Sequence, residues 1–220
     1  MDIMEAMRTR HSVRQYEKKP LTKEIISQLQ AEIEACNRES GLHIQLVTDE
    51  PRAFDGFMAH YGKFDGVTNY IAMIGKKGSA LEETCGYYGE RLVLKAQQMG
   101  LNTCWVAMTF SKIKSAYTLG AGEKLCIVIA LGYGKNQGVS HKSKPLAEVT
   151  KTVNPPQWFL EGAKAALLAP TAMNQQKFTF SLEGNRVTAK AGLGFYSKID
   201  LGIARYHFEI GAGKENFQWQ

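Results

Sequence analysis

The apolar run at residues 124–132, KLCIVIALG, constrains the fold of this 220-residue chain more than any other segment. Its apolar and β-branched residues follow one another without polar interruption, which is typical of a strand buried on both faces. Such a strand needs hydrogen-bonded neighbours along both edges, so we expect it at the centre of a sheet. A chain of this length can bury the required core as one large domain or as two fused small ones.

Shorter patterns predict the elements around this strand. Thr22 stands where a helix N-cap is expected, and Gly100 stands where a helix is expected to end. The predicted strands cover residues 43–48, 69–74, 102–108 (as strand or extended loop), 178–182 and 186–191, and the predicted helices cover residues 1–7, 21–36, 81–99, 157–168 and 200–211.

The order of these elements recurs along the chain. Each half shows a helix, a polar break, strand segments, a long helix and a segment that ends in a tryptophan, Trp105 or Trp219. The long helices carry comparable stretches, CGYYG and LGIAR. We interpret this as a weak internal repeat, with chance as the alternative, because helix–strand–helix order is common. The sequence therefore predicts a single domain over 1–220, with possible related halves at 1–150 and 151–220.

Charge limits the ligand classes. Lys and Arg outnumber Asp and Glu by 27 to 21, which gives a formal net charge of +6 and favours anionic small molecules. The excess is too small and too evenly spread to indicate nucleic acid, and residues 142–144 contain no interleaved aromatic side chain. No apolar run reaches membrane length and the chain is charged from Asp2 onward, so we expect neither a signal peptide nor a membrane partner.

The four cysteines, Cys36, Cys85, Cys104 and Cys126, form no C-x-x-C pair, and no histidine cluster accompanies them. This usage favours reduced, mostly buried thiols in a cytoplasmic protein. It gives no support to a metal site.

Residues 8–16, RTRHSVRQY, connect two predicted helices and concentrate positive charge. The planar donor forks of Arg10 and Arg14 match a phosphate or a carboxylate, and the Ser12 hydroxyl can reach an oxygen close to the backbone. We expect an anion site here. The alternative is a solvated basic surface.

Residues 168–176, LAPTAMNQQ, close a helix and precede a strand. Pro170 prevents the helix from continuing, so the segment is expected to be a rigid turn. The uncharged groups of Thr171, Asn174 and Gln176 suit the edge of a heteroaromatic ring such as a flavin or a pyrimidine. The alternative is a capped turn whose Thr and Asn side chains bond only its own backbone.

Taken together, four segments resemble the FMN-dependent nitroreductase family. The family typically carries an R-x-S-x-R-x-[FY] segment, an A-P-S-x-x-N-x-Q segment, a G-L-x-T-x-W segment after a long helix, and L-G-Y followed by a basic tail. The corresponding residues here are 10–16, 169–176, 100–105, and 131–133 with 142–145.

The order of the segments departs from the family pattern. In the family the A-P-S segment closely follows the Arg segment, but residues 35–41 here read ACNRESG and have lost the Pro and the Asn spacing. The family is usually an obligate homodimer with FMN at the subunit interface. A chain with its Arg segment in one half and its A-P-T turn in the other resembles a fused pseudo-dimer, so a monomer is favoured over a homodimer. Residues 200–220 offer no second Arg cluster, which favours one flavin site.

The resemblance implies an α+β fold with a central mixed or antiparallel sheet flanked by helices. It implies an enzyme that passes electrons from NAD(P)H to a nitroaromatic, quinone or similar small-molecule acceptor by ping-pong hydride transfer at flavin N5. No side chain is expected to be catalytic, because the flavin carries the chemistry. The alternative is a flavin-binding protein of the same fold with another redox chemistry, such as desaturation, dehalogenation or flavin breakdown, or with no turnover.

The resemblance also implies the cofactor-binding residues. Five basic or hydroxyl side chains would meet the FMN phosphate, namely Arg10, Ser12, Arg14, Lys142 and Lys144. His11 is expected mainly to pack or to contact backbone. The complete predicted set is Arg10, His11, Ser12, Arg14, Trp105, Val106, Ala107, Lys142, Lys144, Pro170, Thr171, Ala172, Asn174 and Gln176.

Overall fold

The computed structural model describes all 220 residues, and they divide into two compact units. The first unit contains residue 1 and residues 10–81 and 92–139, and the second contains residues 2–9, 82–91 and 140–220. The units interleave along the chain, so the halves at 1–150 and 151–220 stay a prediction. None of the helices is both long enough and apolar enough to cross a membrane.

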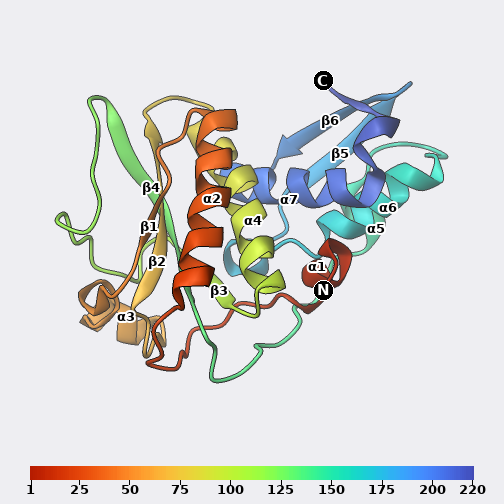
Figure 1. Cartoon of the computed structure of the whole chain (residues 1–220). Coiled ribbons are helices and arrows are strands. Elements are labelled where there is room, and N and C mark those ends of the chain that lie inside the picture. Colours follow the sequence, from red (N-terminus) through yellow and green to blue (C-terminus); the bar gives the residue numbers. More distant parts are fainter. The chain divides into compact units, whose positions relative to one another are not determined.

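The first unit is built on a four-stranded antiparallel sheet in the order β1-β2-β4-β3 (Figure 1). The predicted central strand, β4 (Glu123–Gly132), pairs with β2 (Asn69–Lys76) along one edge and with β3 (Asn102–Val106) along the other. The short β1 (Gln45–Val47) completes the sheet beside β2. The central position of the 124–132 segment is therefore confirmed.

Helix α2 (Lys23–Ser40) lies alongside this sheet (Figure 1). It begins where Thr22 predicts, because the Ile25 amide donates to Thr22 Oγ1 at 3.3 Å. It ends four residues later than predicted. Gly41, with φ of 71°, takes the left-handed conformation that stops a helix, so the polar residues before it continue the helix instead of breaking it.

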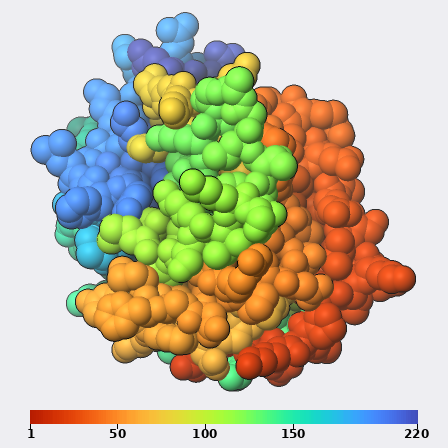
Figure 2. All heavy atoms as spheres, turned by 90° about the vertical axis from the view of Figure 1, so that its left-hand side faces the viewer, coloured from red at the N-terminus to blue at the C-terminus, as the bar shows by residue number.

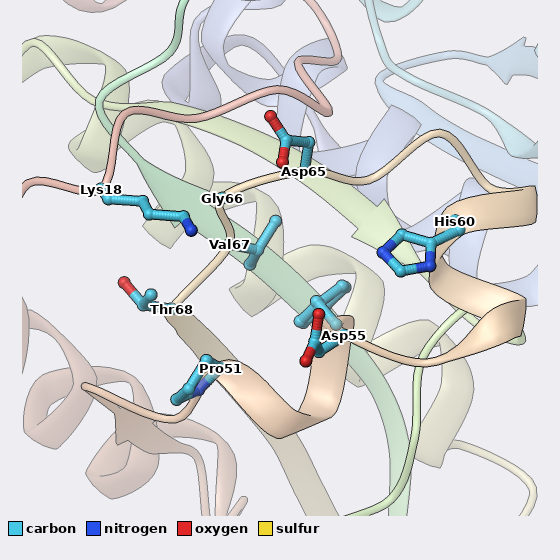
Figure 3. Close-up of a pocket in the computed structure, with 9 residues that line it drawn as sticks. Lys18, Pro51, Asp55, His60, Asp65, Gly66, Val67 and Thr68 are labelled. Atoms are coloured by element: carbon cyan, nitrogen blue, oxygen red, sulfur yellow. The ribbon is translucent and has the colours of Figure 1, made fainter.

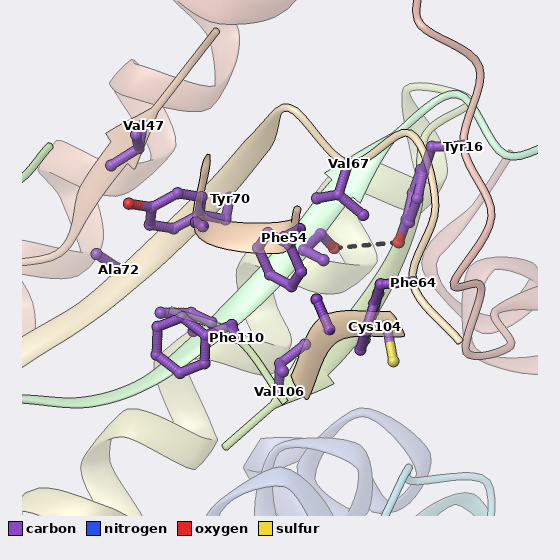
Figure 4. Close-up of a cluster of buried hydrophobic side chains, with 14 of the residues drawn as sticks. Tyr16, Val47, Phe54, Phe64, Val67, Tyr70, Ala72, Cys104, Val106 and Phe110 are labelled. Atoms are coloured by element: carbon purple, nitrogen blue, oxygen red, sulfur yellow. Dashed lines mark hydrogen bonds between the residues drawn. The ribbon is translucent and has the colours of Figure 1, made fainter. Parts of the chain in front are cut away.

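The segment between β1 and β2 carries the 3₁₀ turn η1 (Pro51–Phe54) and the short helix α3 (Phe57–Tyr61). Phe54 and Phe64 hold this segment to the unit, with ring centroids 5.1 Å apart in a cluster that also contains Tyr70 (Figure 4). On the surface of this unit the segment between β1 and β2 adjoins the segment after β3 (Figure 2). The Ser111 amide joins the two by donating to the Ala53 carbonyl at 2.7 Å.

The second unit surrounds an aromatic core. The hairpin β5 (Phe178–Glu183) and β6 (Arg186–Ala191) is antiparallel, and β7 (Gln218–Trp219) adds to β6 in parallel. Helix α7 (Ser197–Ala212) packs against α6 (Gln157–Ala166). The centroid of the Phe208 ring on α7 lies 4.5 Å from that of the Phe180 ring on β5. The remaining elements of this unit are α1 (Ile3–Thr9), α5 (Leu146–Val149), η2 (Ala172–Asn174) and η3 (Lys214–Asn216).

Helix α4 (Leu81–Gln98) contributes residues 82–91 to the second unit, where they cross α7 at two glycines. A Cβ on Gly86 would lie 2.1 Å from the Ile199 carbonyl oxygen, and one on Gly202 would lie 2.0 Å from the Glu83 carbonyl oxygen. The two contacts are therefore reciprocal. Gly86 faces the carbonyl of the residue three positions before Gly202, and Gly202 faces the carbonyl of the residue three positions before Gly86. A two-fold axis between related helices produces this kind of reciprocal contact.

Candidate functional site

The predicted anion-binding segment is fixed along both sides by backbone hydrogen bonds within the first unit. The Val13 amide donates to the Thr103 carbonyl at 3.0 Å, which ties the segment to β3. On its other side the Lys135 amide donates to the Gln15 carbonyl at 2.9 Å. Residues 10–17 therefore form an ordered strip between β3 and the tail that follows β4.

Tyr16 anchors this strip in the core. Its side chain is 1% exposed, and its hydroxyl donates to the Val13 carbonyl at 2.7 Å (Figure 4). Burial raises the pKa of Tyr16 well above its ordinary value, so this hydroxyl keeps its proton at neutral pH. Gly66 passes so close that a Cβ there would lie 2.2 Å from the Tyr16 carbonyl oxygen, and its φ of +71° is also left-handed. Only glycine fits at this position.

Arg10, Ser12 and Arg14 gather near the beginning of β3. Arg10 is only 3% exposed, whereas Arg14 is exposed and Ser12 is half-buried. All three affect the pKa of the Cys104 thiol. Burial raises this pKa, and Arg14, Ser12 and Arg10 oppose the rise. The Arg10 guanidinium is thus a largely desolvated cation, which rules out a solvated basic surface at this residue.

The other predicted residues of the first unit take different places. His11 packs against the tail after β4, where a Cβ on Gly138 would lie 2.8 Å from the His11 Cβ. Val106 is buried in the aromatic cluster, so its side chain is committed to the core. Trp105 precedes Val106 on β3, so its side chain points to the opposite face of the sheet, and it is half-buried. Ala107, just beyond the strand, is also half-buried.

A small hollow of about 160 Å³ opens next to this strip and is lined by Lys18, Asp55, His60 and Asp65 (Figure 3). Lys135 binds Asp65 at 2.6 Å and holds the pKa of that carboxyl below its ordinary value. The lining holds two acidic residues and one lysine, so it offers a phosphate dianion no excess of positive charge.

In the second unit the predicted turn is strained. Met173, Asn174 and Gln176 have φ values of 51°, 53° and 44°, in the left-handed region that non-glycine residues rarely adopt. Each such residue costs about 1–3 kcal/mol, and such strain is concentrated at functional sites in proteins. The turn is nevertheless closed by the Gln176 amide, which donates to Thr171 Oγ1 at 3.1 Å.

The structure brings this turn together with the predicted basic tail. Gln176 Nε2 donates to the Lys142 carbonyl at 2.8 Å, and its Oε1 accepts from the Lys144 amide at 2.9 Å. Asn174 Nδ2 also donates to the Lys142 carbonyl, at 2.9 Å. The side chains of Thr171, Asn174 and Gln176 thus hold the loop and the tail in place. Their contact with a flavin stays a prediction, as does that of Pro170 and Ala172.

Asp200, in the first turn of α7, was not among the predicted site residues. Its Oδ1 accepts from the Ala172 amide at 3.0 Å, and its Oδ2 accepts from Gln175 Nε2 at 2.7 Å. It is 3% exposed, and burial raises its pKa to about 6. A lone acidic residue in an apolar helical stretch was the only signal that the sequence offered.

The raised pKa of Asp200 predicts a pH-dependent stability. The folded state binds the proton more tightly than the unfolded state, so this stabilisation is complete below the ordinary Asp pKa near 3.8 and is lost as pH rises through about 6. Between pH 4 and 7 the free energy of unfolding should fall by up to about 3 kcal/mol from this group. Urea unfolding at both pH values should show that fall in the wild type and not in Asp200→Asn. An equal fall in both proteins would contradict this assignment.

The residues gather no metal centre: no group of three His, Cys, Asp or Glu side chains is placed to hold an ion. None of the four cysteines forms a disulfide.

Residues 2–212 match the family model described as "Putative TM nitroreductase". The chain belongs to this nitroreductase family. A nitroreductase structure from Thermotoga maritima is similar with a TM-score of 0.66 and 21% identity, over 98% of this chain and 85% of that one. No protein of curated function matches the sequence.

Two shorter neighbours match about two thirds of this nitroreductase-family chain. One is an NADH dehydrogenase or NAD(P)H nitroreductase from Parabacteroides distasonis, with a TM-score of 0.53, 22% identity and coverage of 67% of this chain and 95% of that one. The other is a nitroreductase in complex with FMN from Desulfovibrio desulfuricans, with a TM-score of 0.51, 21% identity and coverage of 67% and 94%. The α+β fold with an antiparallel sheet flanked by helices, which the resemblance implied, is confirmed.

Proposed function

We propose that this protein is an FMN-dependent oxidoreductase that passes electrons from NAD(P)H to a nitroaromatic, quinone or similar acceptor by ping-pong kinetics. The observation that carries the proposal is the ordered strip with a buried guanidinium at Arg10, beside Ser12 and Arg14. Family membership and an FMN-bound neighbour of the same fold support it.

The donor set of the strip fits the phosphate of FMN. Arg10 and Arg14 supply charged donors, and Ser12 adds a hydroxyl on the same short segment. Backbone hydrogen bonds on both sides hold these groups in place, so little ordering is required when an anion binds. When bound, FMN would supply the two-electron redox chemistry. We keep the sequence-based predictions that Lys142 and Lys144 also meet the phosphate and that residues 170–176 contact the ring.

We also propose that a single chain is sufficient for activity, as a monomer with one FMN. The reciprocal glycine contact at Gly86 and Gly202 supports this, because two related subunits packed about a two-fold axis would make a contact of that form. The cytoplasm is the proposed compartment, since four cysteines without a disulfide suit a reducing environment.

Reduction by NAD(P)H tests the enzyme activity. Mixing the FMN-loaded protein with NADH or NADPH without oxygen should bleach the flavin absorbance at roughly 450 nm, and a nitroaromatic or a quinone should then restore it. Double-reciprocal plots at several acceptor concentrations should be parallel, as ping-pong kinetics requires. A flavin that stays oxidised in excess NADH and NADPH would instead indicate a flavin-binding protein without this turnover.

A further inference from the structure

The first unit has a second, larger hollow of about 440 Å³ where β2 ends and β4 begins. Lys77 follows β2, Lys112 and Lys114 come from the segment between β3 and β4, and Lys124 lies on β4. The lining includes the first three residues of β4, so the seven residues 126–132 separate this hollow from the end of the sheet at which Tyr133 and Lys135 bind the Arg10 strip. Seven residues of strand span roughly 23 Å, so the two sites are distinct.

The lysines of this hollow are not neutralised by acidic groups. None of the four ammonium groups lies within ion-pair distance of a carboxylate, and Glu123 is the only acidic residue of the lining. The Glu123 carboxylate is already engaged: His43 Nδ1 lies 2.8 Å from its Oε2, and the Gly120 amide donates to the same oxygen at 2.6 Å. The hollow therefore carries an excess of positive charge.

The lining between these cations is apolar. Leu119 is 51% exposed, Leu125 is half-buried and Tyr117 is buried. Figure 2 shows the surface on which the green segment containing these residues meets the yellow turn after β2. The Lys77 amide donates to the Gly122 carbonyl at 3.0 Å, which ties the turn to the base of β4 and orders both sides of the hollow.

We propose that this hollow binds a small amphipathic anion, in which a carboxylate, sulfonate or phosphate is attached to an aromatic or short aliphatic body. Its volume lies within the range of small-molecule sites. The anionic group would meet the lysine ammonium groups, and the apolar body would cover Leu119 and Leu125 and remove their surface from water. An inorganic anion would leave the apolar lining exposed to water, and an uncharged apolar molecule would give the lysine ammonium groups no anionic partner. The proposal does not depend on the flavin assignment.

A pair of fluorescent probes tests both halves of this proposal on the full chain. The first is 8-anilinonaphthalene-1-sulfonate, an aromatic sulfonate, and the second is N-phenyl-1-naphthylamine, which has the same aromatic body without the charge. We expect one sulfonate probe to bind per chain with micromolar affinity that falls as salt is added, and the uncharged probe to bind at least about tenfold more weakly. Equal binding of both probes would overturn the anion requirement.

Matched triple substitutions locate the binding. Lys77→Gln/Lys112→Gln/Lys114→Gln should weaken the sulfonate probe at least about tenfold, since three cations are removed from the rim. The control removes three exposed lysines that line no part of the hollow, Lys23→Gln/Lys190→Gln/Lys198→Gln, and therefore makes the same change in net charge. The control should bind as the wild type does. An equal loss in both triple variants would show that only net charge matters.

Competition identifies the ligand chemistry and keeps the two sites apart. Naphthoate and naphthyl phosphate should displace the sulfonate probe at concentrations at which inorganic phosphate and acetate do not. Displacement by inorganic phosphate at the same concentration would remove the apolar half of the proposal. The flavin-site variant Arg10→Ala/Arg14→Ala should bind the sulfonate probe as the wild type does, and a loss of binding there would show that the hollow is not separate from the flavin site. Circular dichroism of each variant confirms that the comparison is made between folded proteins.

Discussion

Replacing both arginines of the ordered strip, as Arg10→Ala/Arg14→Ala, is expected to release FMN during purification. Charge-assisted hydrogen bonds contribute about 1.5–3 kcal/mol each, so losing two should weaken FMN binding by about 100-fold or more. Binding of riboflavin, which lacks the phosphate, should change little. Equilibrium titration of each apoprotein with FMN and with riboflavin measures both affinities.

The nearby Arg8 supplies the matched control for this experiment. It belongs to the same RTRHSVR stretch but is exposed at the end of α1, so Arg8→Ala should bind FMN as the wild type does. Because Arg10 is buried, the single variant Arg14→Ala is measured as well, and it should lose part of the affinity while remaining fully folded. Full flavin retention by the double variant would refute the assignment of the phosphate site.

Gly66→Ala is expected to have the largest effect on stability. The new Cβ would lie 2.2 Å from the Tyr16 carbonyl oxygen, a backbone atom that can yield only if the strip itself moves. We expect a loss of about 2–4 kcal/mol in the free energy of unfolding, together with weaker FMN binding because Arg14 and Ser12 move with Tyr16. Denaturant unfolding and FMN titration measure the two effects.

Gly41→Ala separates the clash from the backbone strain. Gly41 has the same φ of +71° as Gly66, but a Cβ there would meet nothing within 4 Å. This control should cost only about 1 kcal/mol, the penalty of a left-handed alanine, and should leave FMN binding unchanged. Equal losses in the two variants would show that the contact with Tyr16 is unimportant.

The parts of this fold that local pattern determines were predictable from sequence. The central strand β4 was predicted because nine consecutive residues, 124–132, leave few other environments for so apolar a segment. Thr22 and Gly100 marked helix ends through the chemistry of a single residue. In contrast, β7 has two residues and exists only because it pairs with β6, which no local pattern encodes.

The candidate site was predictable as residue types and not as an arrangement. The proposal that Arg10, Ser12 and Arg14 bind a phosphate follows from their side-chain chemistry, but the burial of Arg10 depends on elements more than 90 residues away, such as β3. The bonds from Gln176 to Lys142 and Lys144 cross more than 30 residues. The role of Asp200 depends on the strained loop at 172–175, whose conformation arises from tertiary contacts.

Sedimentation equilibrium of the FMN-loaded protein, recorded at 280 nm and at roughly 450 nm where oxidised flavin absorbs, tests the central proposal most directly. The two absorbance profiles give the mass of the flavin-bearing species and the number of flavins per chain in one experiment. The proposal predicts a single species of 24.5 kDa that carries one flavin. Two flavins per chain, a flavin-bearing dimer, or flavin that does not sediment with the protein would contradict it.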